Sequence, residues 1–475
     1  MRPLFPILGQ TLVWSAVIGM SGCALVYDFD RPLPPGIGTD VPADPQGSDG
    51  GFLDGLIPVL PADSGPAPDM GVMVEPNRLC PPLGQRRGNT IELGPDQVES
   101  LPGLVSGAAP NTTIKLLPGQ YVLDQGLQLA ADGLILRSTT GNRGSVTISG
   151  RGLGADDSVI TITGSDVTVA DLTIIDAQVH GIWVRGPDMG APGRTGPLIY
   201  NMHIRDSRSS AIMLDSPDAS DMDDGTIGCS HIELTPAGRT DVVDGCLMGG
   251  IVLYRAHDWR IHHNLIEGIF CADELALHGI HVASQSARTV IEGNRVLDCA
   301  RGIGVGYYGE GEPMRPYEGS SCPEAAYVDD NDSLVRNNFV AANDPRLLTS
   351  TAGFQHGIGL WNACNTSVYH NTVYSPRAPT DAPIDTRYAT TTARLKNNLL
   401  SHGIRVRDDA QVVVEGNLEN VPAAIFVDPA VGDLHLTPGS EAKDRGVDLG
   451  VETPPLDIDG DARSDGLPDP GADEL

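Results

Sequence analysis

The stretch that decides the fold reads Val290-Ile291-Glu292-Gly293-Asn294-Arg295-Val296, an asparagine set among aliphatic residues. The phrase returns through the second half of the chain at spacings of 30, 44, 33, 27 and 19 residues, and its asparagines are Asn264, Asn294, Asn338, Asn371, Asn398 and Asn417. Imperfect periods of this length are typical of stacked supersecondary units, none of which can bury its own apolar face. The sequence therefore predicts a solenoid of repeated coils.

A second phrase is interleaved with the first: a small residue, an isoleucine, a variable residue, then valine or leucine. One copy is Gly279-Ile280-His281-Val282, and others lie at residues 181–184, 211–214, 250–253, 302–305, 357–360 and 403–406. The aliphatic residues alternate with mixed ones, as in a short strand with one buried face. Parallel stacking of such units puts the inward asparagines above one another, so they can form a hydrogen-bonded ladder. We predict an all-β, right-handed parallel β-helix (a solenoid) with long loop insertions.

Bulk composition agrees with short strands and argues against one class of partner. The 475 residues include 57 glycines and 37 prolines, and only 5% are aromatic. This balance suits tight corners better than packed helices. The formal net charge is −31, which repels phosphate backbones, so we expect no nucleic-acid partner. We also expect a monomer.

The N-terminus has the pattern of an export signal. Met1-Arg2 precedes an apolar stretch over residues 4–20 that is short and interrupted for a membrane-spanning helix. The tetrad Met20-Ser21-Gly22-Cys23 resembles the lipobox of bacterial lipoproteins, which implies lipidation of Cys23. In that family an aspartate after the cysteine favours retention at the inner membrane, so Ala24 implies an anchor at the outer membrane or cell surface. The alternative is ordinary signal cleavage nearby.

These patterns divide the chain into four segments. Residues 1–22 are expected to be the lipoprotein signal peptide, and residues 23–77 a disordered tether rich in Pro, Gly and Asp. Residues 78–430 are expected to form the β-helix, and residues 431–475 a C-terminal tail. The protein would then meet the membrane only through its N-terminal lipid.

The cysteines are disulfide candidates because an exported chain meets an oxidising environment. The chain has 8 cysteines, and setting the lipidation candidate aside leaves an odd number. The pairs that sequence proximity favours are Cys229 with Cys246, Cys271 with Cys299, and Cys322 with Cys364. Cys80 is then left unpaired, although sequence alone does not fix the connectivity.

The interleaved phrases resemble those of the pectate-lyase-like superfamily of β-helix proteins, over about residues 112–419. The tail, which ends Gly471-Ala472-Asp473-Glu474 before the last residue, resembles the C-terminal segment of bacterial surface β-helix proteins. Its Asp457-Ile458-Asp459-Gly460-Asp461 spacing is similar to a calcium loop, but Ala462 stands where an EF-hand has glycine. Calcium is the one cofactor that the sequence raises, and a solvated acidic turn is the alternative.

If the aliphatic residues of the second phrase point inward, their neighbours form a row on the outer side of one sheet. Rings that stack on sugars and guanidinium groups that bind hydroxyls or uronates are what a polysaccharide groove needs. The residues that we predict to bind substrate are Trp183, Arg185, Trp361, Arg405 and Arg407 in the row, with Arg315 from the insertion at residues 307–332. The alternative is an exposed sheet with scattered aromatic residues.

His281 lies in the middle of this row and is our candidate for acid/base work, with Asp215, Tyr254 and Tyr308 as partners. Histidine precedes the repeat phrase in four coils, at His180, His278, His356 and His402, and this recurrence indicates a structural role.

The stretch over residues 281–296 resembles the alginate lyase and chondroitinase B family, but Gln285 stands at that family's lysine position. No family catalytic residue therefore carries over. We expect a protein that binds polysaccharide and processes it by lyase, epimerase or hydrolase chemistry. The alternative is a non-catalytic protein of cell-surface adhesion or envelope structure.

Overall fold

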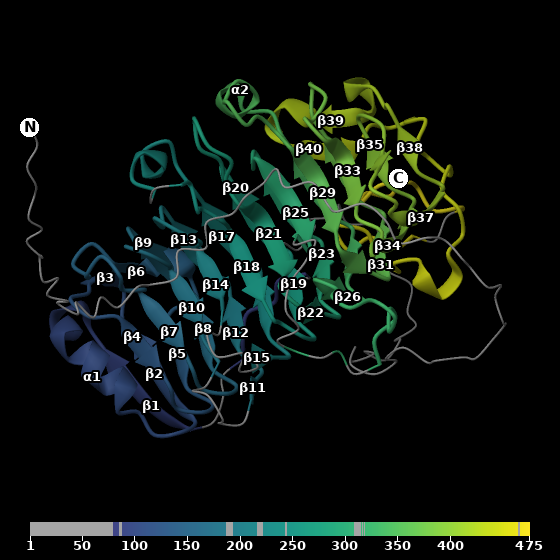
Figure 1. Ribbon diagram of the computed structural model, residues 1–475. Coiled ribbons are helices and arrows are strands. Elements are labelled where there is room, and N and C mark those ends of the chain that lie inside the picture. Colours follow the sequence, from purple (N-terminus) through teal and green to yellow (C-terminus); the bar gives the residue numbers. More distant parts are fainter. Residues whose placement is uncertain are drawn as a thin grey trace, which may run out of the picture. The chain divides into compact units, whose positions relative to one another are not determined.

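The computed structural model describes residues 79–84, 88–186, 193–215, 222–242, 245–307, 315, 317, 319–463 and 466–475. The expected signal peptide, the tether with Cys23, and Tyr308 lie outside these residues. Three long parallel sheets dominate the part described (Figure 1). This architecture confirms the predicted all-β, right-handed parallel β-helix. No helix in the described part of the chain is long and apolar enough to cross a membrane.

Each typical coil gives one strand to each sheet. The 12-stranded sheet contains β1 (Asn89–Leu93), β2 (Thr112–Leu116), β5 (Ile135–Ser138), β8 (Thr168–Ala170), β12 (Leu198–Tyr200), β16 (Thr226–Gly228), β19 (Arg260–His262), β23 (Val290–Glu292), β27 (Leu334–Arg336), β31 (Thr366–Tyr369), β34 (Thr392–Lys396) and β37 (Gln411–Glu415). The 11-stranded sheet contains β3 (Gly119–Val122), β6 (Val146–Ser149), β9 (Thr173–Ile175), β13 (His203–Arg205), β17 (His231–Glu233), β20 (Leu265–Glu267), β24 (Arg295–Leu297), β28 (Phe339–Ala341), β32 (Thr372–Tyr374), β35 (Leu399–Leu400) and β38 (Leu418–Glu419).

The 10-stranded sheet is the one that carries the second sequence phrase. It contains β4 (Leu127–Leu129), β7 (Ile160–Ile162), β10 (Ile182–Val184), β14 (Ile212–Leu214), β18 (Ile251–Tyr254), β21 (His278–Ala283), β25 (Arg301–Val305), β29 (His356–Trp361), β33 (Ala382–Arg387) and β36 (Arg405–Val406). Smaller elements are β22 (Ser286–Ala287), β26 (Asp330–Asn331) and β30 (Ala363–Cys364) in one sheet, β11 (Arg194–Thr195) with β15 (Met222–Asp223), β39 (Phe426–Asp428) with β40 (Asp433–Leu436), and helices α1 (Leu101–Ser106) and α2 (Pro345–Leu348).

The core is a continuous column of aliphatic side chains inside the three sheets. Ile291 of β23, Val296 of β24 and Ile303 of β25 represent one coil, and each is at most 1% exposed. Full burial of such a side chain contributes roughly 1.5–3 kcal/mol, but only once the next coil covers it. Helix α1 buries Leu101 and Val105 in this same core, near its N-terminal end.

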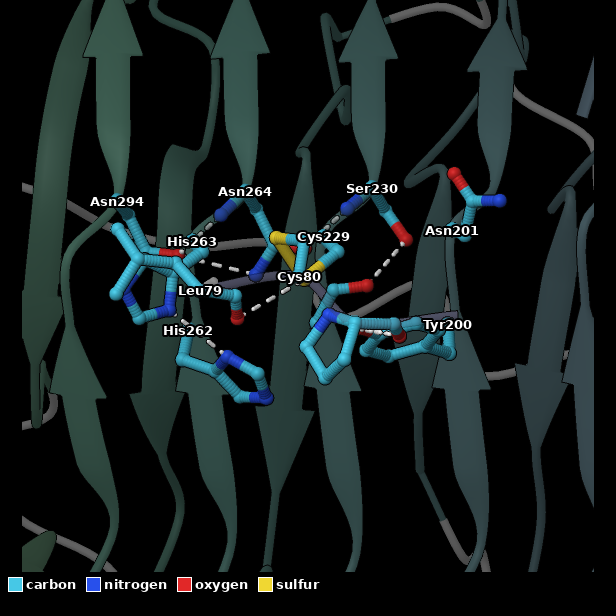
Figure 2. The surroundings of a disulfide bond; sticks show 12 residues. Leu79, Cys80, Tyr200, Asn201, Cys229, Ser230, His262, His263, Asn264 and Asn294 are labelled. Atoms are coloured by element: carbon cyan, nitrogen blue, oxygen red, sulfur yellow. Dashed lines mark hydrogen bonds between the residues drawn. A yellow bond between two sulfur atoms is a disulfide. The ribbon is translucent and has the colours of Figure 1, made fainter. Parts of the chain in front are cut away.

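The predicted asparagine ladder is present at the corner between the 12-stranded and 11-stranded sheets. The amide nitrogen of Asn294 donates to Oδ1 of Asn338 at 3.0 Å, and that of Asn338 donates to Oδ1 of Asn371 at 2.9 Å. The series runs from Asn264 to Asn417 with the same geometry. Ser230 extends it by one coil, since its backbone N–H donates to Asn264 (Figure 2). Each buried amide is therefore satisfied by the next coil.

The residue before each ladder asparagine makes the corner by adopting a left-handed conformation. The φ angles are 51° at His263, 65° at Gly293 and 51° at Asn337. Glycine adopts this conformation freely, and asparagine and histidine adopt it more readily than most residues. The turn therefore requires a residue that tolerates this conformation, and at position 293 that residue is glycine.

The C-terminal tail packs on the outer face of the 11-stranded sheet. Leu434, Ile458 and Ala472 are buried there in one cluster with Phe339 of β28. The carboxylate of Asp457 accepts backbone N–H groups of Asp459 and Asp461, at 2.9 and 2.8 Å. The acidic turn thereby uses its carboxylates to hold its own backbone.

Three disulfides form, and two of the expected pairs are wrong. Cys322–Cys364 is confirmed, whereas the other bonds join Cys80 to Cys229 and Cys246 to Cys271, leaving Cys299 free and buried. Cys80 was expected to be unpaired, but its segment lies along the 12-stranded sheet, where the Tyr200 hydroxyl donates to the Pro81 carbonyl at 2.8 Å (Figure 2). Cys299 instead lies inside the core column. Proximity in sequence misleads here because the coils bring distant segments together.

Replacing a ladder residue should destabilise the protein strongly. We expect Asn338→Ala to lower the free energy of unfolding by about 3 kcal/mol, because it leaves buried donors of Asn294 without an acceptor. Urea unfolding measures this difference. Asn343→Ala is the matched control at a half-buried site outside the ladder, and it should change stability by less than about 0.5 kcal/mol. Equal effects of both substitutions would contradict a stabilising role of the ladder.

Candidate functional site

The outward side chains of the 10-stranded sheet are in register from coil to coil. Paired positions on successive strands are Trp183, Met213, Val252, His281, Gly304, Gly359, Asp385 and Arg405. Asp385 was missed by the sequence pattern because Pro383 stands in β33 where the other copies have glycine or alanine. The flanking Ile384 is the signal that could have found it. We call this set, with the outward residues that flank it, the outer row.

Trp183 and Arg185 lie at the first end of the outer row, and both are half-buried. The Arg185 guanidinium lies 5.7 Å from the Trp183 ring centroid, and the Trp183 indole N–H donates to the Asp215 carbonyl at 3.3 Å. The Asp215 carboxylate forms an ion pair with Arg255. This end of the row therefore presents one ring edge to solvent beside a guanidinium group.

His281 lies at the centre of the outer row, but it is only 1% exposed. The rings of Tyr254 and Tyr307 meet it edge to face, with centroids at 5.8 and 5.7 Å. The backbone of Gly306 offers the ring a hydrogen bond. Burial, together with the Arg301 cation, lowers the pKa of His281 to about 3. The imidazole is neutral at physiological pH and covered by two tyrosine rings.

Two further histidines complete a buried cluster that the sequence reasoning assigned to structure alone. His278 and His356 approach through their Nε2 atoms at 3.0 Å, and the ring of His278 lies 4.3 Å from that of His281. Burial lowers the pKa of both residues, that of His278 well below its usual value. Arg301 is 3% exposed and lies over the Tyr307 ring at 5.2 Å. We call His278, His281, His356 and Arg301 the histidine cluster.

The glycines of the outer row make room for this cluster. A Cβ added at Gly304 would lie 2.5 Å from Nε2 of His278, and one at Gly359 would lie 2.6 Å from Nε2 of His356. The outward space over these glycines is thus filled by imidazole rings. It is not free for a ligand to approach the backbone, as an exposed glycine would allow.

The second end of the outer row is an ionic network. The Trp361 indole N–H donates to Asp385 at 2.7 Å, and the Tyr307 ring stacks on Trp361 with centroids 5.1 Å apart. Arg407 lies 2.9 Å from the Asp385 carboxylate. Arg405 pairs with Asp381 at 3.2 Å and keeps 45% of its side chain exposed. Trp361 is only 6% exposed, so at this end the arginines are the groups that reach solvent.

Arg315 lies apart from the row, at the rim of a separate cavity of about 450 Å³ whose lining includes Gln285, Tyr317 and Tyr327. Its guanidinium forms two hydrogen bonds to Asp223, at 2.9 and 2.6 Å, and another to the Arg255 carbonyl at 2.7 Å. Of the proposed catalytic set, the structure therefore brings Tyr254 against His281 and pairs Asp215 with Arg255. Tyr308 lies outside the described residues.

Comparison with known proteins supports the fold and leaves the chemistry open. No protein-family model and no curated protein matches the chain. Among solved structures, pectate lyase Pel9A matches 82% of this chain and 97% of its own, at 12% identity and a TM-score of 0.51. A rhamnogalacturonan lyase matches 80% and 96% at 13% identity and a TM-score of 0.45, and the GH136 lacto-N-biosidase from Eubacterium ramulus 71% and 68% at 13% and 0.46. The protein thus has the right-handed parallel β-helix fold of Pel9A.

The buried histidines make stability depend on pH with a definite sign. The unfolded chain binds protons on histidine near pH 6.5, whereas folded His281 resists protonation down to about pH 3. The free energy of unfolding therefore falls as the pH drops through this window. At pH 5, His281 alone should contribute a loss of about 2 kcal/mol. Urea unfolding of the wild type and of His281→Phe, each at pH 7.5 and pH 5, measures this contribution. Between the two pH values the variant should lose about 2 kcal/mol less unfolding free energy than the wild type. An equal loss in both proteins would contradict the buried neutral state.

Proposed function

We propose that this protein binds polysaccharide along the outer row, from Trp183 to Arg405. The observation that supports this proposal most directly is the register of the row, which sets the Trp183 indole ring at one end and the Arg405 guanidinium at the other across successive coils. Seven steps between adjacent strands at about 4.8 Å span about 34 Å. The two ends of the row are thus far enough apart for several sugar units of an extended chain, which would pass over the tyrosine rings that cover His281.

The two ends of the row offer complementary contacts for such a ligand. Trp183 supplies a half-buried indole ring with the Arg185 guanidinium over it, and Arg405 supplies a half-exposed guanidinium. Rings stack on the apolar faces of pyranoses, while guanidinium groups form paired hydrogen bonds with carboxylates. Because the chain carries a net charge of −31, local arginine contacts rather than long-range attraction would have to hold an acidic polymer.

A second candidate function is turnover of the bound polysaccharide by lyase, epimerase or hydrolase chemistry. The observation that favours it is the histidine cluster, in which three imidazole rings lie together near the guanidinium of Arg301. A neutral imidazole can accept a proton. However, His281 would need Tyr254 or Tyr307 to move before a substrate could reach it, since both rings cover it. Binding without turnover would serve adhesion or envelope structure.

Binding and turnover can be tested with one set of variants. We expect the full-length protein to bind at least one member of a panel of neutral and uronate-containing polysaccharides. Trp183→Ala should weaken this binding about tenfold through the lost stacking. Arg185→Ala should also weaken binding. Its matched control is Arg394→Ala, on the outer face of the 12-stranded sheet, which should bind as the wild type does. Failure to bind any polymer, or equal losses in both arginine variants, would overturn the proposal.

The same incubations report turnover. Absorbance of unsaturated products would indicate β-elimination, and new reducing ends alone would indicate hydrolysis, with and without added calcium. His281→Ala should abolish either signal, whereas Trp183→Ala should only weaken it. Retained binding without either product would leave the adhesion function and exclude lyase or hydrolase turnover.

We further propose that the protein is exported and anchored through lipid on Cys23, at the outer membrane or cell surface. The tetrad Met20-Ser21-Gly22-Cys23 supports this proposal. Cys23→Ser should move the protein from the membrane fraction to the soluble fraction of the cell envelope, because a polypeptide without its acyl chains loses their membrane affinity. Immunoblotting of fractions measures the shift. A substitution that leaves the protein membrane-bound would exclude the lipid anchor.

A further inference from the structure

Two histidines lie side by side on the outer face of the 11-stranded sheet, away from the outer row. His203 of β13 and His231 of β17 are directly paired positions on neighbouring strands. Their rings are parallel within 1°, with centroids 4.7 Å apart, and about a fifth of each side chain is exposed. Both Nε2 atoms therefore reach the same strip of surface.

Each imidazole points at a carboxylate of the next coil. Nε2 of His203 lies 2.9 Å from Glu233, and Nε2 of His231 lies 2.7 Å from Glu267. Glu233 and Glu267 are themselves paired positions on β17 and β20. One donor atom each from His203, His231 and Glu233 lies within 4.8 Å of the others. Three donors, from His203, His231 and Glu233, thus converge, and Glu267 lies beside them against His231.

The carboxylates of Glu233 and Glu267 are bonded to histidines rather than to basic side chains. Within the described residues, neither glutamate pairs with an arginine or a lysine. Arg143 donates instead to the carbonyls of Met202 and Cys229, and Arg205 lies 3.8 Å from Asp206. The ion pairs of the two carboxylates are therefore with the histidines, although Arg205 is the paired position of Glu233 on the neighbouring strand.

We propose that His203, His231, Glu233 and Glu267 form a binding site for a divalent transition-metal ion of the zinc class. Histidine nitrogen and glutamate oxygen are established zinc ligands at about 2.0–2.2 Å, which places tetrahedral donors about 3.3 Å apart. The donors of His203, His231 and Glu233 lie within 4.8 Å of one another, and Glu267 lies 2.7 Å from His231, so rotation about the side-chain bonds would bring them to these distances. The ion would join three successive coils on a face that is separate from the polysaccharide row.

The second histidine–carboxylate cluster of the described residues shows what a site unsuited to metal looks like. His435 lies between Asp433 and Asp459, 2.7 Å from the latter, and these contacts raise its pKa to about 9. A protonated imidazole has no lone pair for a metal. Arg295 also occupies Asp459, at 3.2 Å. That cluster is an internal ion-pair network that holds the tail.

Zinc titration of the full-length protein, stripped with chelator, tests the site. Calorimetry should show one ion bound per chain, and Co²⁺ in its place should give the absorption bands of a tetrahedral site. His231→Gln should reduce the affinity at least tenfold. His402→Gln, at a histidine whose Nδ1 atom lies 3.0 Å from the Ser401 hydroxyl, is the matched control and should bind as the wild type does.

Two further variants keep the test decisive. Glu233→Gln retains the shape of the side chain but removes its charge, so it should weaken zinc binding even if His231→Gln fails to fold. His435→Gln should leave the binding unchanged. Absence of zinc binding to the wild type, wild-type affinity in Glu233→Gln, or loss of binding in His435→Gln would each overturn the proposal.

Discussion

The structure depends on one constraint: the buried ladder amides of each coil need acceptors on the coils next to it. The ladder asparagines show this directly, since the amide of Asn294 has its acceptor on Asn338 and also donates to the backbone carbonyl of Ile261 at 2.9 Å. A buried amide without these partners would cost several kcal/mol. The register between coils is therefore fixed at the ladder corner, and the strands on either side inherit it.

The same register organises the outside of the solenoid. Side chains at equivalent positions are stacked about 4.8 Å apart, so the equivalent residues of successive coils form a row on the surface. On the 10-stranded sheet the result is the outer row, and on the 11-stranded sheet it is the paired histidines His203 and His231. Chemistry on this fold arises from neighbouring coils rather than from residues close in sequence.

The two outward surfaces differ in how deeply their histidines are buried. The tyrosines Tyr254 and Tyr307 cover His281, which keeps its imidazole neutral and away from solvent. His203 keeps 23% of its side chain exposed and faces a carboxylate. The first arrangement suits a packed cluster beneath a binding surface, and the second suits an ion that arrives from solution. The difference follows from which side chains stand over each histidine.

The sequence by itself determined the solenoid, the asparagine ladder and the alignment of Trp183 with His281 and Arg405, because these follow from local periodicity. Only the tertiary structure decided that His281 is buried, that the space over Gly304 belongs to His278, and that Cys80 pairs with Cys229. Asp385 escaped the pattern because proline replaced the small residue of its phrase. Periodicity fixes which positions share a face, whereas the rotamers and long-range segments that cover that face depend on contacts between residues far apart in the chain.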